Sequence, residues 1–107
     1  MKKVALIVAG GKGERMNADI PKQFLLLNNL PILMHTIKQF SHFEEIVLVL
    51  PKSQFDYWNG LCKNNNFTQI HILVEGGETR FHSVKNGLDK IDNTSFVAIH
   101  DGVRPLI

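Results

Sequence analysis

Hydrophobic residues along this chain gather in four short, largely apolar runs, at positions 4–8, 45–50, 70–74 and 96–99. Each run is followed closely by glycine or proline, and apolar residues between the runs recur every three or four positions. Short apolar runs with such boundaries are typical of strands that are buried on both faces of a parallel sheet. We therefore predict four strands over these positions.

The spacing of apolar residues between the runs predicts three helices. Pro31 suits the first turn of one helix, Ser53 is expected to cap the second, and Thr79 is expected to cap the third. The expected apolar faces are, in chain order, residues 33, 34, 37 and 40, then 55, 58, 61 and 62, then 81, 84, 88 and 91. Alternating strands and helices predict an α/β fold with a parallel sheet and right-handed crossovers.

Unusual residues follow the ends of three predicted strands. A glycine-rich loop follows Val8, a glycine pair follows Val74, and a His-Asp-Gly sequence follows Ile99. Open parallel sheets bind their ligands outside the carboxyl ends of the strands. We therefore expect the three loops to converge on one crevice.

The first loop combines four small residues, Ala9, Gly10, Gly11 and Gly13. The loop does not match the P-loop pattern, and it fails the dinucleotide-binding fingerprint at the third glycine. Small residues directly after a buried strand let backbone N–H groups approach a phosphate or a base closely. A tight strand-to-helix turn without a ligand is the alternative.

Two cations near this loop favour the ligand. Arg15 can clamp phosphate oxygens with two hydrogen bonds, while Lys22 acts as a compact point charge. Pro21 fixes the backbone just before Lys22 and so restrains where the lysine emerges. Both cations are therefore candidates for stabilising charge on a nucleotide's phosphates.

The other two loops offer further candidate ligands. The backbone at Gly76 and Gly77 can read the flat edge of a base, and Ser83 can donate to a ligand from a helix start; a solvated serine is the alternative. Asp101 suits a Mg²⁺ ion or a sugar hydroxyl, unless it caps a turn and pairs with Arg104.

Composition restricts the class of protein. The chain has 107 residues, which is enough for one small domain, and a net charge of +2, which is too small to imply nucleic-acid binding. The single cysteine, Cys62, cannot form an intrachain disulfide and is expected to be a partly buried helical residue. No apolar run has the length of a membrane span, and no signal peptide is recognisable, so we expect a cytoplasmic protein without a membrane partner. The histidines at 35, 42 and 71 lack metal-ligand spacing and are expected to be structural.

Four stretches together resemble the 2-C-methyl-D-erythritol 4-phosphate cytidylyltransferases of the non-mevalonate isoprenoid pathway. They are residues 9–16, 21–24, 76–84 and 100–105, in the family's order. The resemblance implies a three-layer, Rossmann-like nucleotidyltransferase sheet that is mostly parallel. It also implies transfer of CMP from CTP to methylerythritol phosphate, a sugar-alcohol phosphate, with release of pyrophosphate and with Mg²⁺ as cofactor.

The same resemblance implies roles for individual residues. Arg15 and Lys22 match the catalytic cations that act at the α-phosphate. Asp101, which is also the candidate metal ligand, and Arg104 match the junction of nucleotide and sugar phosphate. The positions that match base-reading residues, or lie beside them, are Ala9, Gly10, Gly11, Gly13, Gly76, Gly77, Glu78 and Ser83.

The family domain is about twice as long as this chain, so residues 1–107 are expected to form the nucleotide-binding half of one domain. The other half is expected to grip the acceptor phosphate and to supply an arm for a homodimer. The chain alone is then expected to be inactive in transfer, and its last strand is expected to favour self-association. Ribitol-5-phosphate cytidylyltransferase and a non-catalytic CTP-binding module are the alternatives.

Overall fold

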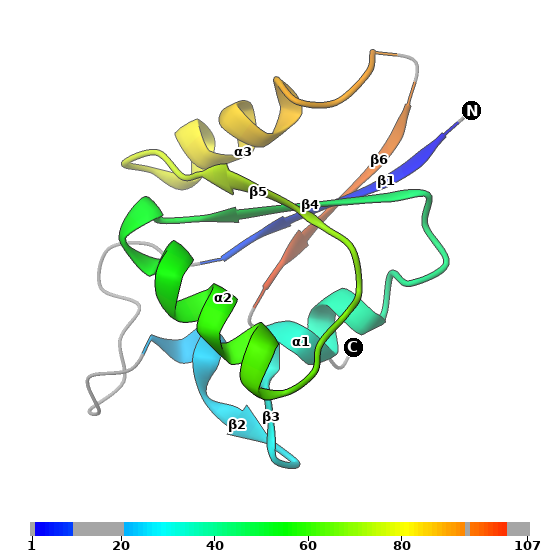
Figure 1. Ribbon diagram of the computed structural model, residues 1–107. Coiled ribbons are helices and arrows are strands. Elements are labelled where there is room, and N and C mark those ends of the chain that lie inside the picture. Colours follow the sequence, from blue (N-terminus) through cyan, green and yellow to red (C-terminus); the bar gives the residue numbers. More distant parts are fainter. Residues whose placement is uncertain (1, 10–20, 94, 103–107) are drawn as a thin grey trace.

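A four-stranded parallel sheet forms the centre of the protein in the computed structural model, which describes residues 2–9, 21–93 and 95–102 (Figure 1). The strand order is β5-β4-β1-β6, and every neighbouring pair is parallel. The strands are β1 (Lys3–Val8), β4 (Glu45–Leu50), β5 (Ile72–Glu75) and β6 (Phe96–Asp101). The predicted α/β fold with a parallel sheet is confirmed for these residues.

Three α-helices connect the strands and cover both faces of the sheet. They are α1 (Ile32–Lys38), α2 (Phe55–Asn64) and α3 (Arg80–Leu88). In Figure 1, α1 and α2 lie below the sheet and α3 lies above it, so the molecule has three layers. Short 3₁₀ helices, η1 (Lys22–Phe24) and η2 (Lys52–Gln54), follow Pro21 and Pro51.

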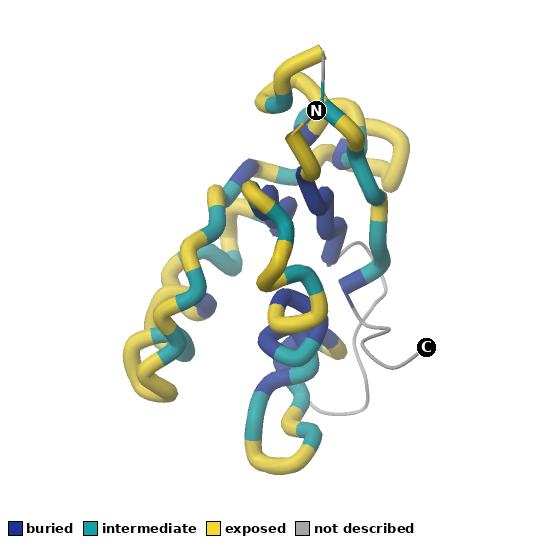
Figure 2. Tube along the Cα trace, turned by 90° about the vertical axis from the view of Figure 1, so that its right-hand side faces the viewer, coloured by how far each residue is buried: buried dark blue, intermediate teal, exposed yellow. Residues whose placement is uncertain are grey.

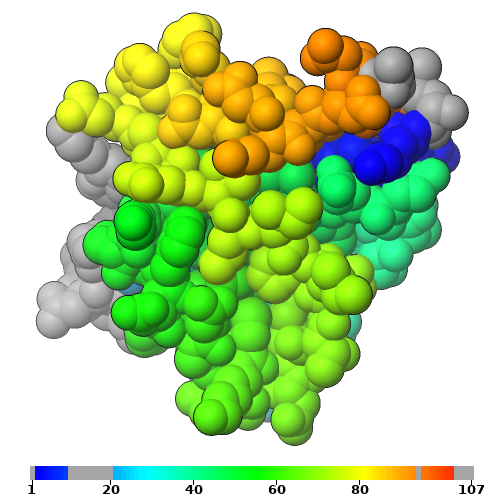
Figure 3. All heavy atoms as spheres, turned by 45° about the horizontal axis from the view of Figure 1, so that its top comes forward, coloured from blue at the N-terminus to red at the C-terminus, as the bar shows by residue number. Residues whose placement is uncertain are grey.

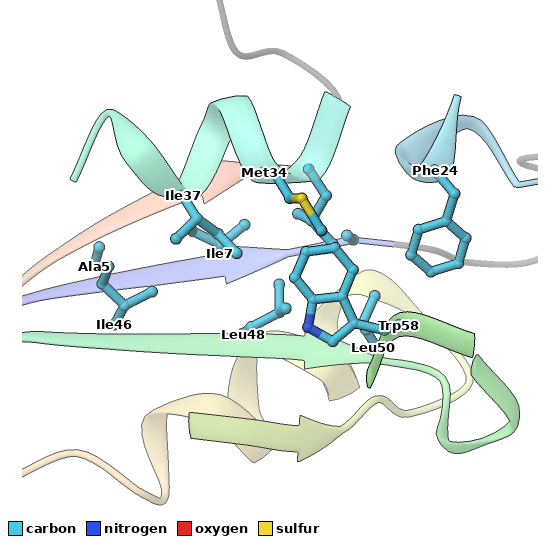
Figure 4. Close-up of a cluster of buried hydrophobic side chains, with 11 residues drawn as sticks. Ala5, Ile7, Phe24, Met34, Ile37, Ile46, Leu48, Leu50 and Trp58 are labelled. Carbon is cyan, nitrogen blue, oxygen red and sulfur yellow. The ribbon is translucent and has the colours of Figure 1, made fainter. Parts of the chain in front are cut away.

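Alternation along the central strands divides the core into two clusters. Ala5, Ile7, Leu48 and Leu50 face α1 and α2, where Trp58 is fully buried among them (Figure 4). The residues that alternate with these along the strands point to the opposite face of the sheet, toward α3. They are Val4, Leu6, Val8, Val47, Val49 and Val74. Strands that are apolar on both faces require a helix on each side, which explains the three layers. Figure 2 shows the buried central strands between exposed outer segments.

A small antiparallel hairpin, formed by β2 (Leu26–Leu27) and β3 (Leu30–Pro31), was not anticipated from the sequence. Its turn residues Asn28 and Asn29 have φ angles of 53° and 68°. Asparagine tolerates this left-handed conformation, and two such residues suit a two-residue hairpin turn. The Asn-Asn pair between leucines was therefore a usable signal.

Two predicted boundaries are wrong. Helix α2 begins at Phe55 after Gln54, and no side chain caps its first N–H groups, so Ser53 is not the cap. Strand β5 starts at Ile72 instead of residue 70, and the side chain of Ile70 is 84% exposed.

The expected apolar face of α3 is also wrong in part. Thr79 caps the helix as predicted, because its hydroxyl accepts a hydrogen bond from the N–H of His82 at 3.1 Å. Val84 and Ile91 pack against the sheet as predicted. Phe81 and Leu88 are 72% and 40% exposed, however, and the unpredicted Gly87 is buried against the sheet. A Cβ at Gly87 would collide with the Leu6 side chain, so helix and sheet approach closely here. Figure 3 shows α3 (yellow) at the surface, above α2 (green).

Candidate functional site

The three loops named from the sequence all begin at the carboxyl end of the parallel sheet, here called its carboxyl edge. The N–H of Ala9 donates to the Val49 carbonyl at 3.0 Å, and the N–H of Gly76 donates to the Leu50 carbonyl at 2.8 Å. On the other side of β1, the N–H of Gly102 donates to the Val8 carbonyl at 2.9 Å. These bonds extend the strand ladders by one residue and hold all three loop starts at one edge. The three described loop starts therefore share the carboxyl end of the sheet, with the loops after β1 and β6 adjacent and the loop after β5 two strands away from β1; convergence on one crevice stays a prediction.

The order in which successive strands are added to the sheet reverses at β1. The chain moves outward from β1 to β4 and β5, and then returns to place β6 on the other side of β1. The helices of the outward path cover one face, and α3 covers the other. Such a switch point opens a crevice outside the carboxyl ends of the two strands concerned. The crevice is therefore expected between the loops that follow β1 and β6.

Ala9 and Gly102 pack tightly against each other at this switch point. A Cβ at Gly102 would lie 2.6 Å from the Ala9 Cβ and 3.1 Å from Leu33 Cδ1, so only glycine allows this approach of the two loops. The hydroxyl of Thr36, a fully buried residue of α1, donates to the Gly102 carbonyl at 2.9 Å. A helix on one face thus holds the backbone directly after Asp101.

Asp101 is the last residue of β6 and pairs in register with Val8. It is half-buried, and Gly102 after it is buried. The carboxylate therefore originates at the switch point, one residue from the Ala9–Gly102 contact. Among the described residues, no group of three or more His, Cys, Asp or Glu side chains could hold a metal ion.

The glycine pair after β5 is shaped by Ser83. This residue is 5% exposed, and its hydroxyl oxygen accepts a hydrogen bond from the Gly77 N–H at 3.0 Å. A Cβ at Gly77 would collide with the His82 side chain, while one at Gly76 would lie 3.1 Å from Ser83 Oγ. The alternative of a solvated serine is wrong. Glu78 is exposed at the tip of the same loop.

Lys22 stands on a segment that is anchored by its two following residues. Gln23 is fully buried and Phe24 is 3% exposed, whereas the Lys22 side chain is exposed. The Phe24 ring stacks on Trp58 with a centroid separation of 6.1 Å and an interplanar angle of 19° (Figure 4). Within the described residues Lys22 forms no ion pair, so its charge is available to an anion.

The amide of Gln23 connects this segment to the loop after β4. Its Nε2 donates to Gln54 Oε1 at 2.6 Å, while its buried Oε1 has no hydrogen-bond partner in the described part of the chain. A buried acceptor without a partner typically costs about 1–3 kcal/mol. Sequence reasoning missed Gln23, Gln54 and Thr36, because polar residue types give no sign of burial by themselves.

Five predicted site residues lie outside the described residues. They are Gly10, Gly11, Gly13, Arg15 and Arg104. The described candidates at or near the carboxyl edge are Ala9, Gly76, Gly77, Glu78, Ser83 and Asp101, with Lys22 on the anchored segment.

Two groups in the described part of the chain with shifted pKa values, Cys62 and Glu44, lie outside this group of residues. Burial raises the pKa of the Cys62 thiol from 9.0 to about 11, which agrees with the predicted half-buried helical cysteine. A hydrogen bond from the Lys3 N–H lowers the pKa of the exposed Glu44 carboxyl.

Among the histidines expected to be structural, His71 accepts from Trp58 Nε1 at 2.9 Å and His35 donates to the Leu27 carbonyl. No helix in the described ranges is long and apolar enough to cross a membrane.

Comparison with known proteins identifies one family. The family model described as 2-C-methyl-D-erythritol 4-phosphate cytidylyltransferase matches residues 3–107. Proteins of that name are similar to this chain, with 50% identity over 110 residues in Bacteroides thetaiotaomicron and 56% over 107 residues in Porphyromonas gingivalis. These matches cover 100% and 99% of this chain, but only 50% and 48% of the relatives. The chain thus spans about half the length of the curated relatives it matches.

Solved structures give the same result. The crystal structure of the Francisella tularensis 2-C-methyl-D-erythritol 4-phosphate cytidylyltransferase aligns with a TM-score of 0.74 and 35% identity. The alignment covers 98% of this chain and 46% of that one. A nucleotidyl transferase from Methanothermobacter thermautotroptrophicus, at 17% identity, shares the fold with a TM-score of 0.72.

Proposed function

Because this chain belongs to the 2-C-methyl-D-erythritol 4-phosphate cytidylyltransferase family, we propose that its protein transfers CMP from CTP to 2-C-methyl-D-erythritol 4-phosphate and releases pyrophosphate. The observation that carries the proposal is that three motif-bearing loops start at the carboxyl end of the sheet, two of them at the switch point between β1 and β6. Open α/β sheets bind nucleotides at this place, which supports the proposal.

The proposed reaction needs no covalent protein nucleophile. A phosphate oxygen of the acceptor attacks the α-phosphorus of CTP, a new P–O bond forms, and the bond to the bridging oxygen breaks so that pyrophosphate leaves. The task of the protein is to align the two reactants and to stabilise negative charge on the α-phosphate oxygens. Lys22 supplies an exposed charge on a rigidly anchored segment, and Arg15 is proposed to supply the second.

The nucleoside is proposed to bind across the first and second loops. Backbone groups of Gly76 and Gly77 approach the base because no side chain intervenes, and Ser83 holds the Gly77 N–H in place. Glu78 extends from the same loop. The small residues that start at Ala9 are proposed to let backbone N–H groups contact the nucleotide.

Mg²⁺ is proposed as the cofactor, with Asp101 as its protein ligand. The described residues offer this one carboxylate at the switch point, which fits an ion that proteins often hold through one or two carboxylates together with substrate phosphates. The bound ion would neutralise phosphate charge. Arg104 is proposed to lie at the junction of nucleotide and acceptor, and the whole protein is proposed to act as a homodimer.

Pyrophosphate release tests the proposal directly. The assay uses the full-length enzyme, meaning this chain continued to the length of its curated relatives, with CTP and Mg²⁺. Addition of methylerythritol phosphate should trigger pyrophosphate release. No release is expected with ribitol 5-phosphate or when the acceptor is omitted. Release with ribitol 5-phosphate alone would identify the other acceptor, and CTP binding without turnover would indicate a binding module.

Charge removal tests the catalytic cations in the same assay. Lys22→Ala and Arg15→Ala should each lower kcat by about 10²–10³-fold with a smaller change in the KM for CTP, as expected when a transition-state donor is lost. Lys63→Ala removes an exposed lysine at the end of α2 and should leave kcat unchanged. A fall of less than threefold for Lys22→Ala would exclude its catalytic role.

A further inference from the structure

Lys22 can stabilise a transition state only if its side chain leaves the protein in a fixed direction. Its backbone is restrained on both sides, because the Phe24 N–H donates to the Pro21 carbonyl at 3.0 Å and the Leu25 N–H donates to the Lys22 carbonyl at 3.1 Å. These bonds define the turn itself. They do not fix how the turn is oriented relative to the sheet, so contacts to the rest of the protein must do so.

The Ile32 N–H at the start of α1 donates to the Leu25 carbonyl at 2.8 Å and holds the far end of the segment. Nearer to Lys22, two side chains make such contacts, and they differ in kind. Phe24 packs against Tyr57 and Trp58 of α2, with ring centroids 5.0 and 6.1 Å apart. Apolar packing of this kind is non-directional and tolerates small rotations of the segment. The 2.6 Å hydrogen bond from Gln23 Nε2 to Gln54 Oε1 is directional, because its strength falls steeply with angle.

Gln54 places this bond near the candidate site. It ends η2, the short helix that follows β4 at the carboxyl edge, where Ala9 and Gly76 bond to the carbonyls of Val49 and Leu50. The amide pair therefore connects the segment that carries Lys22 to the sheet edge where the loops begin. No other described side-chain hydrogen bond connects residues 21–25 to the sheet or its loops.

The amide of Gln23 is not explained by stability. Its side chain is fully buried, and its Oε1 has no hydrogen-bond partner within the described ranges. An apolar side chain of similar length would fill the same space without burying an unsatisfied acceptor. A polar group that is costly in the core but directional in its contact suits orientation better than packing.

We propose that Gln23 is a positioning residue that, through its hydrogen bond to Gln54, sets the direction of the Lys22 side chain toward the nucleotide phosphates. The inference rests on the proposed function, since it assumes that Lys22 acts on the transition state. A displacement of about 1 Å in such a group can reduce the rate by about a hundredfold. The amide pair should therefore affect kcat without contacting the substrate.

A double-mutant cycle in the full-length enzyme tests this coupling. Gln23→Met should lower kcat by about 10–100-fold, with the KM for CTP changed by less than about threefold and the melting temperature equal or higher. In the Lys22→Ala background, the same substitution should change kcat by less than about twofold, because a misdirected lysine no longer exists. An equal loss in both backgrounds, or a loss below threefold in the wild type, would overturn the proposal.

Substitutions at the partner keep the test independent of any folding defect in Gln23→Met. Gln54→Glu retains an acceptor oxygen for Gln23 Nε2, while Gln54→Met removes it, so the Glu variant should exceed the Met variant in kcat at least fivefold. This difference should disappear in the Lys22→Ala background, and its persistence there would refute positioning through the lysine. If Lys22→Ala itself leaves kcat unchanged, the catalytic assignment fails; if it lowers kcat and the cycle is additive, only the inference about Gln23 fails.

Discussion

Gly77→Ala is the substitution for which the structure gives the clearest expectation. The new Cβ would collide with the Cβ of His82 and would lie 3.2 Å from its carbonyl carbon and 3.3 Å from its Cα. These atoms belong to the first turn of α3, which Thr79 caps, so rotating a side chain cannot relieve the collision. The loop has to move away from the helix, which also pulls the Gly77 N–H from Ser83 Oγ.

The magnitude follows from two losses and one gain. Overpacking typically costs about 1–3 kcal/mol, and a lost hydrogen bond costs about 0.5–1.5 kcal/mol. Replacing glycine also reduces the conformational entropy of the unfolded chain, which returns about 0.4–1 kcal/mol. Because Gly77 is exposed and its loop can shift partly, we expect a net loss near the lower end of these sums, about 1 kcal/mol in the free energy of unfolding.

Urea unfolding of the wild type and the variant, followed by circular dichroism, measures this difference. Gly60→Ala provides a matched control, since Gly60 is exposed within α2 and a Cβ there meets nothing within 4 Å. Alanine is the better helix former, so the control should gain up to about 1 kcal/mol. In the full-length enzyme, Gly77→Ala should also raise the KM for CTP. A urea midpoint for Gly77→Ala at or above that of the wild type would refute the reasoning. The loop would then have moved away from His82 without lowering the free energy of unfolding.

Four further outcomes are expected. Thr36→Val leaves the buried Gly102 carbonyl without its side-chain donor and should lower the free energy of unfolding by about 1–3 kcal/mol, whereas Thr36→Ser should lower it less; equal effects in urea unfolding would contradict this. Asp101→Asn should weaken Mg²⁺-dependent pyrophosphate release at unchanged circular dichroism, and an unfolded variant would instead indicate a structural role. Cys62 should react with iodoacetamide at pH 8 about a hundredfold more slowly in the folded than in the unfolded protein, since burial raises the pKa of its thiol to about 11. Because the unfolded thiol ionises first, its burial should also make the free energy of unfolding fall as the pH rises from about 9 toward 11, which Cys62→Ala should prevent.

Local sequence carried enough information for the four strands of the central sheet, apart from the start of β5, and for where the candidate loops begin. The run at residues 45–50 became β4 at the predicted bounds, and Thr79 caps α3 as expected, because these features depend on neighbouring residues alone. The order of strands and loops then placed the glycine pair and Asp101 at one sheet edge, because parallel strands share their carboxyl ends.

Tertiary packing decided which residues support that edge. The sequence favoured Phe81 as part of the buried face of α3, but Gly87 lies there, since the bulky Leu6 leaves no room for a larger side chain. Gln23 stands between an exposed lysine and a buried phenylalanine, and its buried amide bonds to Gln54, thirty-one positions away. A contact of that kind has no local pattern, because it exists only once η1 and η2 have met in the folded chain.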